Sequence, residues 1–133
     1  MFHSIVVGTD GSPTATQAVR RADELAREVD ATLHVVSAYP PSSGGAQSED
    51  ARSGVEAILA DAVGTLDDGA QVETHAVEGA PADALLAAAE RAGADLIVVG
   101  NKGMTGTKRF LLGSVPNQIS HNAQTSVLIV RTT

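Results

Sequence analysis

The residues whose types and spacing best suit chemistry lie between positions 100 and 114, directly after a run of apolar residues. This segment holds four glycines, two lysines, one arginine and three small hydroxyl residues, and it contains no acid. Glycine lets the backbone adopt positive φ angles and come close to a ligand. Amides left free by such a loop, or by a helix N-terminus, bind phosphate. The segment therefore predicts a site that holds the phosphates of a nucleotide.

The distribution of charge supports this interpretation. The net charge is −7, but all 16 acids lie in residues 1–99, which carry −11, whereas residues 100–133 carry +4 and no acid. An acidic chain repels the backbone of nucleic acids, while a local basic segment suits a small anion. The chain also has only two phenylalanines and one tyrosine on which bases could stack. We therefore expect no nucleic-acid partner.

Composition limits the other classes of site. The 133 residues, 43% of them hydrophobic, fit one domain over residues 1–133. The absence of cysteine excludes disulfides and thiolate chemistry. No metal site is expected, because His3, His75 and His121 have no metal-ligand spacing, and His34 within an apolar strand is interpreted as a core or strand-end residue. Without a signal segment or a membrane-length apolar run, we expect a soluble, cytoplasmic protein with no membrane partner.

Apolar periodicity predicts the elements that must position this segment. Strands are predicted at residues 2–9, 31–38, 71–77, 96–99 and 126–131, and helices at 13–29, 49–66, 81–91 and 114–121. Ser12 is predicted to cap the first helix, and residues 39–50 to form a surface loop. Continuously apolar strands that alternate with helices indicate an α/β fold, with a parallel sheet covered on both faces.

Two loops of unusual chemistry follow the first and the fourth predicted strands. The first is Asp10-Gly11-Ser12, and the second begins at Gly100. Ligands of open α/β sheets bind at the carboxyl ends of the strands, where the winding direction reverses. If these two strands are neighbours, both loops meet at that crevice.

The chain resembles the universal stress protein family along its whole length, through the motifs at residues 5–12, 33–36, 79–81, 94–100 and 126–131. The most specific motif is Gly100-x2-Gly103-x9-Gly113-Ser114, which is typical of the nucleotide-binding branch of that family. The resemblance implies a Rossmann-like, three-layer domain with a five-stranded parallel sheet of order 3-2-1-4-5 and four helices. It also implies a homodimer formed through the last strand, Val127 to Val130.

The resemblance further implies an adenine-nucleotide site. On the side of the base, Asp10 would form a hydrogen bond near the adenine or ribose, Thr9 would line the same pocket, and Val35 would pack against the adenine.

On the side of the phosphates, the resemblance implies a role for five further residues. Gly100 and Gly103 would let the backbone approach the ribose and phosphates. Amides and a hydroxyl at the start of the last helix would come from Gly113, Ser114 and Val115.

Two cations and one departure from the family pattern complete the expected site. Lys102 and Arg109 are candidate counter-charges, on chemical grounds rather than from the motif. Pro116 and Asn117 occupy a helical turn where the family commonly has small serine or alanine residues. Proline is tolerated in a first turn, but it removes one amide that could have faced a phosphate.

We expect a nucleotide binder rather than an enzyme. The crevice offers Asp10 but no second carboxylate or histidine as a general base, and no acid follows residue 99 to hold a catalytic metal. The predicted function is an ATP-binding stress-response protein that acts as a nucleotide-dependent, dimeric regulatory module with an unidentified protein partner. ADP and AMP remain open as ligands, and Mg²⁺ could accompany the phosphates. The alternatives are a slow ATPase, or a dimeric interaction module that binds no nucleotide.

Overall fold

The computed structural model describes residues 1–41, 46–67, 71–101 and 115–132. In chain order, these residues form β1 (Ser4–Gly8), α1 (Pro13–Val29), β2 (Thr32–Tyr39), α2 (Ala46–Gly64), β3 (Val72–Glu78), α3 (Pro81–Arg91), β4 (Leu96–Gly100), α5 (Val115–Asn122) and β5 (Ser126–Val130). None of the described helices is both long and apolar enough to cross a membrane.

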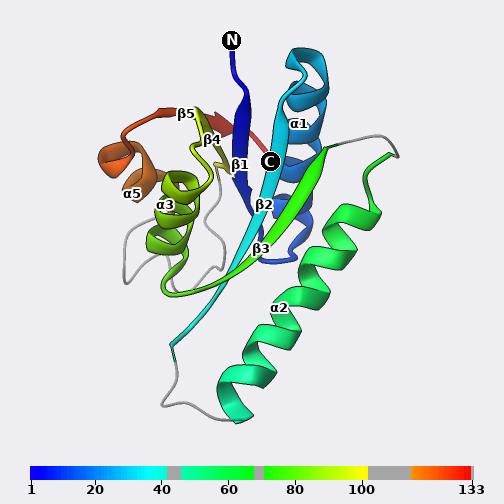
Figure 1. Cartoon of the computed structure of the whole chain (residues 1–133), viewed down its shortest axis with the longest axis vertical. Helices are drawn as coiled ribbons and strands as arrows, with labels where there is room; N and C mark the ends of the chain where they lie inside the picture. The colour runs from blue at the N-terminus through cyan, green and yellow to red at the C-terminus, as the bar shows by residue number, and fades with distance from the viewer. Residues whose placement is uncertain (42–45, 68–70, 102–114, 133) are drawn as a thin grey trace.

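The strands form one parallel sheet in the order β3-β2-β1-β4-β5, which confirms the predicted topology. Figure 1 shows α1 and α2 on one side of the sheet and α3 and α5 on the other. The described residues thus form the expected three-layer α/β fold. β3 and β5 are its two edge strands.

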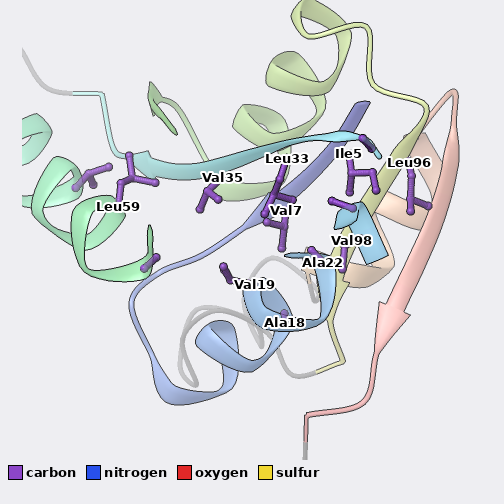
Figure 2. Packing of buried hydrophobic residues seen from close by; sticks show 14 of the residues in the cluster. Ile5, Val7, Ala18, Val19, Ala22, Leu33, Val35, Leu59, Leu96 and Val98 are labelled. Carbon is purple, nitrogen blue, oxygen red and sulfur yellow. The ribbon is translucent and has the colours of Figure 1, made fainter. Parts of the chain in front are cut away.

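Alternate residues of the central strands build two separate cores, one on each face of the sheet. Figure 2 shows the core beneath α1 and α2, which contains Val7, Val35 and Val98 of the sheet and Val19 of α1. The opposite core, beneath α3 and α5, contains Val6, Val36, Leu85, Ile97 and Ile119. Because the central strands are buried on both faces, their sequences are continuously apolar.

The turn into α1 confirms the predicted cap. The Oγ atom of Ser12 accepts a hydrogen bond from the amide of Ala15 at 3.2 Å, and Pro13 occupies the first turn. At the other end of α1, Asp30 adopts a left-handed conformation with φ of 57°. The start and the end of α1 are therefore determined by residues at the helix termini themselves.

The predicted loop at residues 39–50 is wrong at both ends. Tyr39 belongs to β2, because its side chain is buried and its carbonyl accepts a hydrogen bond from the amide of Gly79 at 2.8 Å. At the other end, α2 begins at Ala46 rather than at Glu49. Glu49 consequently lies in the first turn of α2, where its negative charge interacts favourably with the helix dipole. Residues 42–45 lie outside the described ranges.

Candidate functional site

The carboxyl ends of β1 and β4 lie side by side. Val7 of β1 pairs with Val98 of β4 on one side and with Val35 of β2 on the other. The chain winds from β1 towards β3 and then restarts at β4, so the winding direction reverses between β1 and β4. The expectation that the loop after Gly8 and the loop that begins at Gly100 follow neighbouring strands is confirmed. This is the position at which open α/β sheets bind their ligands.

Thr9 fixes the turn after β1 onto the neighbouring strand. Its side chain is only 1% exposed, and its Oγ1 accepts a hydrogen bond from the amide of Gly11 at 3.1 Å. Its amide donates to the carbonyl of Val36 at 2.9 Å, and its carbonyl accepts from the hydroxyl of Ser37 at 2.7 Å. Thr9 therefore lies beneath the crevice and holds its floor in place.

Asp10 follows directly and is only partly buried. One carboxylate oxygen, Oδ1, accepts a hydrogen bond from the amide of Ser12 at 2.9 Å. Within the described ranges, its other oxygen, Oδ2, has no hydrogen-bond partner. The local bond orients the carboxylate, and Oδ2 is left to accept a hydrogen bond from a hydroxyl or amino group of a ligand.

The helix α2 lies close to the turn that carries Asp10. A Cβ atom built on Gly11, which has φ of +85°, would lie 3.2 Å from Cγ2 of Ile58. Ile58 of α2 therefore packs directly against the turn. Val35 is fully buried in the core that α1 and α2 cover. An adenine that contacts Val35 would require the side chains that cover Val35 in this core to move apart.

Gly100 ends β4 at the opposite wall of the crevice. A Cβ atom at this position would lie 3.4 Å from Cγ2 of Thr132 and 3.8 Å from Cβ of Ala18, which are ordinary contact distances. Gly100 is also not among the glycines with positive φ. Among the residues that the structure describes, neither packing nor backbone conformation demands a glycine here. A ligand that comes close to the backbone would be a reason for a glycine at position 100.

Asn101 is a structural residue that the sequence analysis missed. Its Oδ1 atom accepts hydrogen bonds from the amide of Thr132 at 2.7 Å and from the hydroxyl of Thr132 at 3.1 Å. Its own amide donates to the carbonyl of Val130 at 2.7 Å. An asparagine directly after a strand is a common turn residue, and that was the available signal. Asn101 links the start of the glycine-rich segment, as we call residues 100–114, to the end of β5.

The predicted residues Lys102, Gly103, Arg109, Gly113 and Ser114 lie outside the described ranges, so their roles stay predictions.

Val115, the last residue of the predicted set, is the first residue of α5 and is half-buried against the core beneath α3 and α5. Pro116 follows in the first turn of α5 and is buried.

A further group of hydrogen bonds lies at the opposite end of the sheet, where β1 and β4 begin. Both carboxylate oxygens of Asp95 accept hydrogen bonds from the amide of His3, at 3.1 and 2.9 Å, and one also accepts from the amide of Ser4 at 3.1 Å. Burial by itself would raise the pKa of Asp95, but these amide hydrogen bonds outweigh it and hold the pKa below its ordinary value. This carboxylate ties the start of β1 to the start of β4, far from the crevice.

Comparison with known proteins agrees with the geometry. The model of the universal stress protein family matches residues 1–131. The universal stress protein Rv1636 of Mycobacterium tuberculosis is 41% identical over 149 residues, which cover 99% of this chain and 98% of the relative. The universal stress protein MJ0531 of Methanocaldococcus jannaschii is 36% identical over 141 residues, covering 98% of this chain and 83% of the relative.

Solved structures give the same result. A universal stress protein crystallised in complex with cAMP superposes with a TM-score of 0.86 at 36% identity, covering 99% of both chains. The crystal structure of Rv1636 superposes with a TM-score of 0.57 at 39% identity, covering 99% of this chain and 97% of the other. The sheet order, the motifs and these matches agree, and the chain belongs to the universal stress protein family.

Proposed function

We propose that this protein binds an adenine nucleotide, with ATP as the expected ligand, in the crevice between the ends of β1 and β4. The observation that carries the proposal is the adjacency of these two strand ends, which places the loops that begin at Asp10 and Gly100 at one switch point. Asp10 offers an oriented carboxylate with Oδ2 available to the ribose or adenine. Gly100, at the end of β4, has no side chain that would hold a ligand away from its backbone.

The phosphates would lie towards the basic segment that follows β4. Residues 100–133 contain no acid and carry four cationic side chains, two of which are the candidates Lys102 and Arg109. Amides at the start of α5, near Val115, would add to this positive potential. Mg²⁺ would accompany the phosphates of ATP, and no carboxylate of this segment would hold it.

A second candidate ligand is cAMP. Pro116, in the first turn of α5, lacks an amide that could have bound an outer phosphate. This favours a nucleotide with fewer phosphates, and a related structure at 36% identity holds cAMP. The charge of the basic segment favours ATP instead, so the two ligands can be ranked by titration.

We further propose that the protein acts as a dimer through β5 and that the nucleotide influences this edge. Leu128 and Ile129 are 41% and 47% exposed on an edge strand, although side chains of this size and type usually lie inside a fold. The amide of Asn101, at the start of the glycine-rich segment, bonds to the carbonyl of Val130 at the end of β5. A conformational change in the glycine-rich segment, residues 100–114, would therefore be transmitted directly to β5, the proposed dimer edge.

Calorimetric titration of ATP, ADP and cAMP into the purified protein tests the proposal. We expect saturable binding, and we expect Asp10→Ala to weaken it about tenfold, as for the loss of a hydrogen bond to a charged group. Asp83→Ala removes an exposed carboxylate from the first turn of α3 and serves as the matched control. Equal affinity for the Asp10→Ala and Asp83→Ala variants would refute the assigned site, and no binding of any nucleotide would refute the function.

A further inference from the structure

Two histidines that are far apart in the sequence meet on the α3 side of the sheet, near the edge strand β3. Nδ1 of His34 in β2 lies 2.9 Å from Nε2 of His75 in β3, and the two ring centroids are 5.1 Å apart. The strands are in register with His34 beside Glu73 and Val36 beside His75. Since side chains of a strand alternate between faces, Glu73 and His75 lie on the same face of β3.

Glu73 brings a carboxylate to the same place. One ligand atom from each of His34, Glu73 and His75 can be chosen so that all three lie within 4.8 Å of one another. His34 is buried, His75 is half-buried and Glu73 is exposed, so the group has a fixed base and an open side. Two imidazoles and one carboxylate form a common ligand set for divalent transition metals.

The group lines a groove of about 550 Å³, with room for water to complete the coordination of an ion. Arg52 and Arg91 also line this groove, and their charges oppose a free cation. Arg52 is already engaged, donating to Glu56 at 3.1 Å and to the hydroxyl of Tyr39 at 3.3 Å. Arg91 would favour an anionic exchangeable ligand, such as hydroxide or chloride, on the bound metal.

We propose that His34, Glu73 and His75 form a binding site for Zn²⁺ or a chemically similar divalent transition metal. Metal–nitrogen bonds of about 2.0–2.1 Å place two neighbouring imidazole nitrogens about 3.0–3.4 Å apart. The observed 2.9 Å lies about 0.1 Å below the lower end of that range. The metal would replace the proton that the two rings share, and the rings would separate slightly.

His34 is the buried ring of the pair. Burial, with a smaller contribution from nearby His75, lowers the pKa of His34, while Glu73 acts in the opposite direction. A neutral imidazole is the form that binds a metal.

The proposed site differs from the expectation that the chain has no metal site. That expectation was based on the spacing of His3, His75 and His121 along the chain. The partner of His75 is instead His34, 41 residues away on the adjacent strand.

The test is a zinc titration of tag-free protein that has been dialysed against chelator, with no nucleotide present. We expect one Zn²⁺ per chain at micromolar concentration, unaffected by excess Mg²⁺, which prefers oxygen ligands. Co²⁺ at the same site should show visible absorption bands of a nitrogen- and oxygen-ligated ion. Bound Zn²⁺ should also raise the melting temperature.

Glu73→Gln and His75→Gln are the informative variants, because they avoid the buried His34. Each should weaken zinc binding by at least about tenfold and remove the cobalt bands, as loss of a direct ligand should cost no less than loss of an outer-shell partner. Glu78→Gln, on the same strand, and His121→Gln, on α5, are the matched controls and should bind like the unmodified protein. Absence of zinc binding by the unmodified protein, or undiminished binding by Glu73→Gln and His75→Gln, would overturn the proposal. Because no nucleotide is used, either result leaves the nucleotide proposal untouched.

Discussion

The side-chain oxygen of Asn101 accepts hydrogen bonds from both the amide and the hydroxyl of Thr132, at 2.7 and 3.1 Å. Asn101 directly follows β4, and Thr132 lies just beyond β5 and is buried. The two bonds hold the end of the chain across the start of the glycine-rich segment. A Cβ atom at Gly100 would lie 3.4 Å from Cγ2 of Thr132, so Thr132 lies beside the end of β4.

Asn101→Ala should lower both stability and nucleotide affinity. The substitution leaves the buried amide of Thr132 without its acceptor, which costs about 1–3 kcal/mol. It also frees the first residues of the segment that would hold the phosphates. Urea unfolding and calorimetry measure the two effects. Asn122→Ala is the control, because the Asn122 side chain donates only to the nearby carbonyl of Gln118 on an exposed part of α5. Equal stability of the two variants would contradict the structural role of Asn101.

Ile58→Ala should tighten nucleotide binding while it lowers stability. Ile58 packs against Gly11, so a ligand that enters beside the turn at Asp10 requires Ile58 to move, and apparent affinity falls with the fraction of open molecules. Truncation removes that contact and should strengthen ATP binding a few-fold, at a cost of about 1–2 kcal/mol for a half-buried side chain. Leu59→Ala destabilises the same helix through the core and should give no gain in affinity. Weaker binding by Ile58→Ala would show instead that Ile58 contacts the bound base.

Asp95→Asn should destabilise the protein near neutral pH but not in acid. The pKa of Asp95 is depressed in the folded state, so its contribution is present above its ordinary value of 3.8 and is lost as the pH falls through the folded-state pKa. Since Asp95 is partly exposed and solvent screens its charge, we expect a loss of about 0.5–1 kcal/mol at pH 7. Urea unfolding at neutral and acidic pH measures it. Asp61→Asn, which changes an exposed carboxylate on α2, is the control. A difference that persists unchanged in acid would exclude this mechanism.

Ile129→Lys should convert the proposed dimer to a monomer. A lysine on the exposed edge of β5 would be desolvated in an interface, and edge lysines block strand pairing. Light scattering after size-exclusion chromatography should report twice the 13.5 kDa of one chain for the unmodified protein and a single chain for the variant. Gln124→Lys adds the same charge at an exposed position just before β5 and should remain dimeric. A monomeric unmodified protein would remove the basis for dimer-dependent regulation.

Most of the fold could be predicted from the sequence because its signals are local. The apolar run Leu96–Val99 can only be a buried element, and Ser12 with Pro13 marks a helix start without reference to the rest of the chain. The start of α2 was less accessible, because the residues before Ala46 are rich in proline, serine and glycine and obscured the first helical turn.

The parts that could not be predicted depend on contacts between distant residues. Asn101 and Thr132 are 31 residues apart, and His34 and His75 are 41 residues apart. Such pairs follow from strand register and from the position at which a chain crosses a strand end, which no local pattern records. The contact between Ile58 and Gly11 likewise depends on how α2 lies over the sheet.

Chemical-shift mapping of the ¹⁵N-labelled protein during an ATP titration would locate the bound nucleotide. We expect saturable shifts of the amides at the proposed site, from Thr9 to Ser12 and at Gly100, Asn101 and Val115. Amides at the opposite end of the sheet, such as those of Ser4 and Leu96, should not shift. Saturable binding that leaves the amides of Asp10 and Gly100 unchanged would contradict the placement of the nucleotide between β1 and β4.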